Sequence, residues 1–195
     1  MEILTQEEVL ENVGELEKEI LKGATMVFPT DTIYGIGCDA RNSNSIKRIK
    51  RAKQRSRNQP ISFIAPSINW ITQHYEVQDW HEEYLKKLPG AFTYIFQRKN
   101  NCPISIEINP KVSQADGIRI PNSWFYHDVI SQIQIPFCCT SANISGKVNI
   151  LSIEQIEDEM RPFVDYAIRG DRLPIGARGS TIVDLSRDEP KILRQ

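Results

Sequence analysis

Residues 28–37 read Phe28-Pro29-Thr30-Asp31-Thr32-Ile33-Tyr34-Gly35-Ile36-Gly37, a hydroxyl-rich turn that directly follows a short apolar run. The run at 24–28 predicts a strand that ends at Pro29. Beyond the turn lies a basic window, residues 47–57, which holds seven basic residues and no acid: Lys47, Arg48, Lys50, Arg51, Lys53, Arg55 and Arg57. A strand end, a polar turn and a basic helix in this order form a unit suited to handling phosphate.

Composition favours one ordinary globular domain. The chain has 195 residues, is 40% hydrophobic and 25% charged, and carries a net charge of −1, so everything outside the basic window sums to −8. This concentration of positive charge indicates a local anion site and argues against a surface coated by nucleic acid. No apolar run approaches the ~18–20 residues that a membrane span needs. We therefore expect a soluble, cytoplasmic protein with no membrane partner.

Strands and helices interleave along the whole chain, which predicts an α/β fold with a mixed sheet. A capping box at Thr5 and Glu8 begins a helix that Gly23 closes, and Ser43 or Ser45 can cap the basic helix. Further helices are expected at 68–74, 77–88, 124–133 and 153–160. Strands are expected at 61–65, 93–96, 117–121, 136–140 and 164–168, and the strands at 181–185 and 191–193 should pair with each other.

Three common kinds of site are disfavoured. Gly35-Ile36-Gly37-Cys38-Asp39-Ala40 matches G-x-G-x-x-A, but the following helix begins several residues too late for a dinucleotide site. No P-loop motif occurs. The four cysteines lack the spacing of zinc ligands, so we expect buried thiols and no metal bound directly by the protein.

Each remaining motif admits a plain structural interpretation beside a functional one. The basic window can be a solvated helix face, yet Lys53 and Arg55 lie where the helix ends and can turn into a site. The segment from Thr140 to Gly146 is either an ordinary polar turn or a set of hydrogen-bond donors and acceptors that bind a ligand at the end of a strand. Arg119 lies between apolar strand residues and needs an anionic partner if it points inward.

In order, these motifs resemble those of the YrdC/Sua5 family of threonylcarbamoyl-adenylate synthases. The resemblance spans nearly the whole chain, and it implies a single YrdC-like domain over residues 1–195, with helices flanking a twisted mixed sheet around a concave site. The matching segments are residues 28–37, Ala52-Lys53-Gln54-Arg55, Pro60-Ile61, Pro89-Gly90-Ala91-Phe92-Thr93, Ile118-Arg119-Ile120-Pro121, residues 140–146, Ser180-Thr181-Ile182-Val183-Asp184 and Leu193-Arg194.

The resemblance also implies a reaction. L-Threonine and bicarbonate or CO2 give an N-carboxylated threonine, which attacks the α-phosphate of ATP to form L-threonylcarbamoyl-AMP and pyrophosphate. This nucleotidyltransferase supplies the t6A modification at position 37 of tRNA. Mg2+ is expected on ATP, contact with tRNA is conceivable, and downstream threonylcarbamoyl transferase proteins are expected partners. The chemistry needs positioning and charge stabilisation and no side-chain nucleophile.

By the same resemblance, the catalytic cluster is Lys53, Arg55, Ser141 and Asn143, and Gln59 and Arg194 add nucleotide contacts. The residues expected to bind threonine are Thr32, Tyr34, Arg119, Ser141 and Ser180. The sequence departs from the family pattern at Asp31 (usually Glu), Ser56 and Ala91 (often Pro), and Ile64 (often His).

Two other functions remain open at this point. The basic window could line a groove for duplex RNA or tRNA. The related carbamoyl-adenylate chemistry of hydrogenase maturation is a third possibility. Under the leading hypothesis only Lys53 and Arg55 act in catalysis. Lys47, Arg48, Lys50 and Arg51 then form an outer rim that steers ATP or touches tRNA, and Arg57 has no assigned role.

Overall fold

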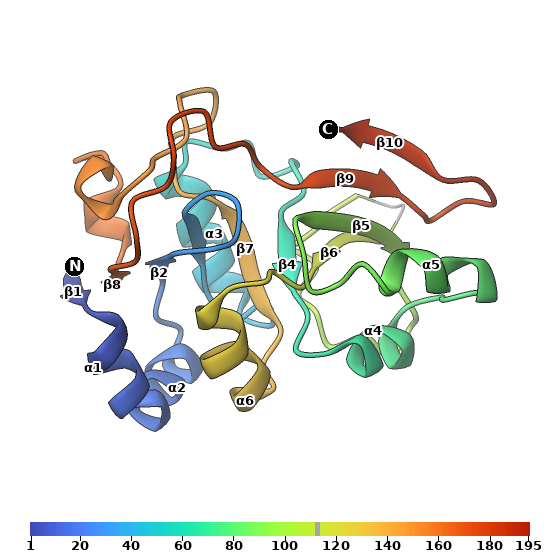
Figure 1. Cartoon of the computed structure of the whole chain (residues 1–195), viewed down its shortest axis with the longest axis horizontal. Coiled ribbons are helices and arrows are strands. Elements are labelled where there is room, and N and C mark those ends of the chain that lie inside the picture. The colour runs from blue at the N-terminus through green and yellow to red at the C-terminus, as the bar shows by residue number, and fades with distance from the viewer. Residues whose placement is uncertain (112–113) are drawn as a thin grey trace.

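One open, ten-stranded mixed sheet organises the molecule (Figure 1). The computed structural model describes residues 1–111 and 114–195. Parallel pairings at β1–β8, β2–β8, β4–β6 and β5–β9 are interspersed with antiparallel ones. In spatial order the strands are β1 (Glu2–Leu4), β8 (Tyr166–Ile168), β2 (Met26–Phe28), β3 (Gly35–Gly37), β7 (Phe137–Ser141), β4 (Ser62–Ile64), β6 (Ala115–Arg119), β5 (Phe92–Gln97), β9 (Thr181–Asp184) and β10 (Lys191–Arg194). The α/β fold with a mixed sheet is thus confirmed, as is the pairing of the last two strands.

The helices are short and lie around the sheet (Figure 1). The α-helices are α1 (Gln6–Glu11), α2 (Val13–Lys22), α3 (Ser43–Ala52), α4 (Ile68–His74), α5 (Glu82–Leu85) and α6 (Ser131–Ile133). Three 3₁₀ turns, η1 (Asp79–His81), η3 (Ile153–Gln155) and η4 (Arg161–Phe163), and one π-helical turn, η2 (Phe125–Ile130), complete the described elements. No helix among the described residues is both long and apolar enough to cross a bilayer.

The first helical segment follows its predicted signals but is interrupted. The capping box forms, because Thr5 accepts from the Glu8 amide while the Glu8 carboxylate accepts from the Thr5 amide. Gly23 ends the segment in the left-handed conformation, as a C-terminal glycine should. Asn12 adopts a non-helical conformation between α1 and α2, so the expected single helix is two.

Helix α3 carries the basic window, and its two ends differ from expectation. Its N-cap is Asn42, whose side-chain oxygen accepts from the amides of Asn44 and Ser45, and neither predicted serine is the cap. At the other end Gln54 takes a left-handed φ of 50°. The Arg55 and Gln54 amides donate to the carbonyls of the helix's last turn, which is the Schellman arrangement without its usual glycine. This reversal directs Arg55 away from the helix axis.

Two other helix predictions are wrong in extent. Residues 153–160 form only the single 3₁₀ turn η3, and 77–88 form only η1 and α5. Both segments keep apolar residues at helical spacing, so the periodicity alone did not reveal that the helices are interrupted. The strand predictions are confirmed to within two residues at their ends.

The aromatic core lies beneath the polar turn that follows β2. The rings of Phe28 and Phe125 stack with centroids 4.8 Å apart, and Phe137 packs edge-on against Phe28 at 5.5 Å. Gly37 lets β3 approach β7, because a side chain there would overlap the carbonyl oxygen of Cys138. The turn from Thr30 to Tyr34 is therefore held between rigid strands.

Candidate active site

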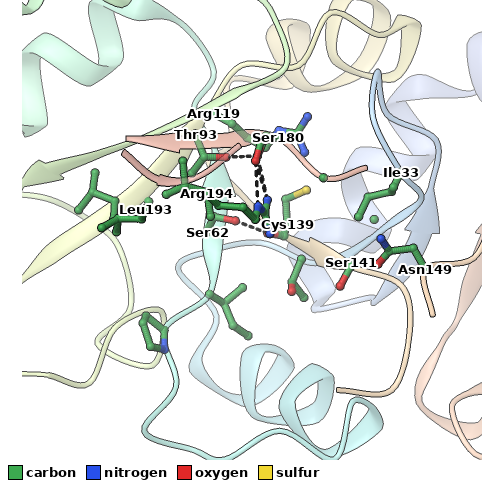
Figure 2. A pocket seen from close by; sticks show the side chains of 18 of the residues that line it. Ile33, Ser62, Thr93, Arg119, Cys139, Ser141, Asn149, Ser180, Leu193 and Arg194 are labelled. Carbon is green, nitrogen blue, oxygen red and sulfur yellow. Dashed lines mark hydrogen bonds between the residues drawn. The ribbon is translucent and has the colours of Figure 1, made fainter. Parts of the chain in front are cut away.

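A cavity of about 380 Å³ opens where the middle strands meet β9 and β10 (Figure 2). Its charged lining residues are all arginines: Arg55, Arg119 and Arg194. Its other polar lining residues are neutral: Tyr34, Ser62, Thr93, Cys139, Thr140, Ser141, Asn149 and Ser180. The lining thus combines cations and hydroxyl groups and contains no carboxylate. Such a lining suits an anionic ligand.

Arg119, the last residue of β6, joins the cavity to the polar turn. It is 5% exposed, and its Nη2 donates to Asp31 Oδ1 at 2.5 Å and to Thr32 Oγ1 at 3.2 Å. The anionic partner expected for an inward arginine is thus present, and the shorter carboxylate of Asp31 still reaches it. Arg119 Nε is buried with no hydrogen-bond acceptor among the described residues. A buried donor without an acceptor is costly, so a carboxylate that reached this N–H would be held strongly.

Lys53 is the most deeply buried cation of the site, at 1% exposed. Its Nζ donates to the backbone oxygens of Ser141 and Asn143 and lies 3.3 Å from Ser141 Oγ. Burial, and then repulsion by Arg55, lowers the pKa of Lys53 to about 7. The lysine therefore supports the turn after β7 and holds a readily exchanged proton beneath Ser141.

Arg55 extends from the reversal after α3 into the cavity. Its Nη2 donates to the Pro60 carbonyl at 2.6 Å, and its Nη1 lies 3.5 Å from Thr140 Oγ1. Burial lowers the pKa of Arg55, and its Nε has no acceptor among the described residues. Lys53 and Arg55 are thus held by carbonyl, hydroxyl and amide oxygens, which leaves their charge available to a ligand.

Ser180, the residue just before β9, lines the same cavity (Figure 2). Its hydroxyl is 2.6 Å from Thr93 Oγ1, and its carbonyl accepts from Arg194 Nη2 at 2.7 Å. Gly179 permits this packing, since a Cβ there would lie 2.8 Å from the Arg194 guanidinium. Burial, and then the neighbouring Arg119, lowers the pKa of Arg194. The end of β10 thereby adds a third cation to the cavity.

Most of the predicted site residues are brought together. Tyr34, Arg55, Arg119, Ser141, Ser180 and Arg194 line the cavity. Lys53 and Thr32 lie directly behind it, within hydrogen-bonding distance of the lining residues Ser141 and Arg119, and Asn143 in turn contacts Lys53. Gln59 is exposed and lies outside the lining, so its contact with the nucleotide stays a prediction.

Sequence reasoning missed several lining residues. Ser62 and Asn149 line the cavity without having been singled out, and Thr93 and Thr140 were noted only as parts of motifs. Period-two alternation indicates which strand residues share a face, but it does not say which face borders a cavity. Cys139 also lines it, and burial raises the pKa of its thiol to about 11, so the thiol stays protonated at neutral pH.

Four of the remaining cations of the basic window contact other groups of the protein, whereas Arg51 is exposed, and the outer rim expected of them stays a prediction. Arg48 makes a two-bond ion pair with Asp165, at 2.7 and 2.8 Å. Lys50 is buried and donates to the Arg57 carbonyl. Lys47 and Arg57 both face the Glu107 carboxylate. Arg48 is thus neutralised and Lys50 is buried, so these side chains do not form a continuous exposed stripe, and a groove for duplex RNA along α3 is not favoured.

The lining offers nothing that would hold a metal ion by itself. Mg2+ prefers carboxylate oxygens, and the cavity lining contains none. The described residues also contain no cluster of three or more His, Cys, Asp and Glu side chains with the geometry to bind a metal.

An open mixed sheet with an arginine-lined cavity defines an α/β protein with a cavity suited to a small anionic ligand. The family model Sua5/YciO/YrdC, described as "Telomere recombination", matches residues 18–195. The chain therefore belongs to the Sua5/YciO/YrdC family.

Named relatives agree with this assignment. A Methanocaldococcus jannaschii protein, provisionally named a threonylcarbamoyl-AMP synthase, is 31% identical over 98% of this chain and 89% of its own length. The threonylcarbamoyl-AMP synthase of Mus musculus is 31% identical over 86% of this chain, which spans only 60% of that protein. The structure of P. abyssi Sua5 complexed with L-threonine superposes with a TM-score of 0.85 at 25% identity, covering 99% of this chain and 56% of that one.

Proposed function

We propose that this protein joins L-threonine, bicarbonate or CO2, and ATP into L-threonylcarbamoyl-AMP, releasing pyrophosphate, to supply the t6A modification of tRNA. One observation carries the proposal: a single cavity is bordered by two cationic groups of different character. Arg119 is already paired with Asp31, whereas Lys53 and Arg55 contact only neutral oxygens. The relatives' names and the threonine complex of P. abyssi Sua5 support the same reading.

The Arg119 side suits the amino acid. Its pairing with Asp31 leaves little net charge, and its unpartnered Nε can receive a carboxylate. Thr93 and Ser180 supply hydroxyl groups at hydrogen-bonding distance from each other, close to Arg194. A small hydroxyl-bearing amino acid can satisfy such groups, and an analogue without the hydroxyl would leave them unpaired.

The Lys53 and Arg55 side suits the phosphates. Carboxylation of threonine makes a carbamate whose oxygen attacks the α-phosphorus of ATP. The new P–O bond forms as the bond from the α-phosphorus to the bridging oxygen breaks, and pyrophosphate leaves with that electron pair. Lys53 and Arg55 would stabilise the charge that develops on the phosphates, and Ser141 would help to orient them. Mg2+ accompanies ATP as part of the substrate.

Pyrophosphate release tests the proposal directly. We expect release from ATP only when both threonine and bicarbonate are present, with threonylcarbamoyl-AMP as the co-product by mass spectrometry. Release that continues when threonine is omitted would refute the proposal.

The Arg55→Ala variant tests the role of the cations. It should lose adenylate formation by about 10³-fold, since removal of one arginine from phosphoryl-type chemistry has effects of this order. Its thermal unfolding should stay close to that of the wild type. Arg161→Ala is the matched control, because Arg161, at the start of η4, forms only an exposed ion pair with Asp158. Near-normal turnover by Arg55→Ala would contradict the assignment.

A further inference from the structure

A second, smaller cavity borders α3, and every residue that lines it is cationic. It measures about 150 Å³ and is lined by Lys47, Lys50, Arg51, Arg55 and Arg57. We call it the α3 cavity. Arg55 also lines the main cavity. One arginine side chain therefore forms part of the wall of both.

The charge around the α3 cavity is unbalanced. Its ion-pair partner among the described residues is Glu107, which lies 2.7 Å from Arg57 and 3.5 Å from Lys47. Five cations against one carboxylate leave an excess of four positive charges in a small volume. Like charges at such separations repel even through solvent, and a multivalent anion between them removes the repulsion.

Two of the five side chains carry buried donors that point to a ligand. Lys50 is 3% exposed, and of its three ammonium hydrogens one reaches an acceptor, the Arg57 carbonyl at 2.7 Å. Arg55 Nε is buried without an acceptor in the described part of the chain. Buried ammonium and guanidinium groups are costly unless they are paired, and phosphate oxygens are the acceptors they match best.

The size of the cavity selects the kind of anion. At the ~30 Å³ that a water molecule occupies in the liquid, 150 Å³ holds about five waters. This space suits an inorganic anion of one or two phosphate groups. A nucleic-acid backbone would need a continuous exposed stripe, but Lys50 is buried and Arg48 is held by Asp165.

We propose that the α3 cavity binds inorganic pyrophosphate, as a subsite that receives this product across Arg55 after it leaves the main cavity. The source of the pyrophosphate rests on the proposed function, whereas the binding itself does not. Such a subsite would separate pyrophosphate from the adenylate and so oppose the reverse reaction.

Calorimetric titration with pyrophosphate tests the proposal on the full chain. The main cavity is first saturated with a non-hydrolysable ATP analogue, and we expect one further pyrophosphate to bind. Arg51→Ala and Lys47→Ala should each weaken this second binding by about tenfold or more, as expected for loss of a charge-assisted contact. Both side chains are partly exposed, so their removal should spare the fold. Lys86→Ala, which removes an exposed lysine paired with Glu82 on α5, is the charge-matched control and should change nothing.

Three results would overturn the proposal. The first is the absence of a second binding event. The second is that Arg51→Ala or Lys47→Ala loses affinity for the ATP analogue and for pyrophosphate equally. That result would mean that these charges attract anions to the whole surface and form no separate subsite. The third is a variant that loses affinity for a short RNA hairpin but not for pyrophosphate. The titration needs no turnover, so it still tests pyrophosphate binding if threonine-dependent synthesis is not observed. The synthesis assay likewise still tests the proposed function if no second pyrophosphate binds.

Discussion

Lys53 shows how burial gives one residue its chemical character. An ammonium group exposed to water stays protonated well above neutral pH, but Lys53 is enclosed by Ser141 and Asn143 and repelled by Arg55. With its pKa lowered to about 7, the side chain is close to half protonated at neutral pH. A bound phosphate favours the charged form and would raise this pKa again.

ATP affinity should therefore fall as pH rises above 7. The protonated form of Lys53, which phosphate prefers, dominates below the pKa of about 7 and is lost above it. Between pH 7.5 and 9 the affinity should drop toward tenfold per pH unit, with uptake of one proton on binding. Titrations in buffers of different ionisation enthalpy measure both quantities.

The control for this prediction is Lys53→Met, which removes the titrating group. That variant should bind ATP more weakly and with a much flatter pH profile. A wild-type affinity that is constant over this pH range would show that Lys53 does not meet the phosphates.

Single residues also mark where sequence reasoning ended. A charge inside an apolar strand needs a partner, so the need for an anion beside Arg119 could be predicted, and Asp31 supplies it. The fate of the basic window could not be predicted, because its carboxylates lie far away in sequence. Glu107 is 50 residues from Arg57, and Asp165 is 117 from Arg48. Only the fold brings these charges together.

At the scale of elements, α3 positions Arg55, one of the predicted catalytic residues. Its C-terminal reversal points Arg55 into the cavity, and its N-terminus is fixed by a single side chain, Asn42. Gln54 occupies the left-handed position where glycine is usual. The helix therefore depends on local contacts at both ends and not on length.

Removal of the cap should lower the stability of the whole protein. Asn42→Ala loses the acceptor for two helix amides, each 3.1 Å away, so the free energy of unfolding should fall by about 1 kcal/mol. Denaturant titration measures this change. Asn44→Ala is the control, because Asn44 is exposed and lies inside the same first turn, where alanine is a better helix former. Equal destabilisation by both variants would contradict the assignment of Asn42 as the cap.

Elements with a clear local signal were the predictable ones. The capping box at Thr5, the glycine stop at Gly23 and the apolar strands such as β7 all carry their information within a few residues. The break at Asn12 and the 3₁₀ turn at Ile153–Gln155 do not. There, tertiary packing decides between helix and turn, because the intrinsic preferences differ by only fractions of a kcal/mol per residue.

At the scale of the molecule, the strand order β3-β7-β4-β6-β5-β9 makes the site. It places residues from Ile33 to Arg194 around one cavity (Figure 2), although they are spread over most of the chain. This order follows from long-range strand pairing, which the sequence of a single strand does not specify. The motifs could be recognised one by one along the sequence, but only the structure shows that they meet around one cavity.

Tyr34 joins the polar turn to the segment that delivers Ser180. Its hydroxyl accepts from the Gly170 amide at 3.0 Å and donates to the Asp171 carbonyl at 3.4 Å, across more than 130 residues of sequence. Any side chain at Gly170 would strike Pro29, so the two segments are in close contact. The hydroxyl thus anchors the start of the chain stretch that runs from Gly170 to Ser180.

Tyr34→Phe should therefore loosen this stretch while leaving the sheet intact. Loss of two hydrogen bonds should speed amide hydrogen exchange at residues 170–180 by about 30-fold, since each contributes about 1 kcal/mol. The KM for threonine should rise while the thermal midpoint changes little, because the Tyr34 ring stays buried. Hydrogen-exchange mass spectrometry locates the change. Tyr84→Phe is the control, since Tyr84 is partly exposed and engaged mainly through its ring. If exchange in Tyr34→Phe quickens throughout the sheet instead, the hydroxyl supports the core and not the segment that carries Ser180.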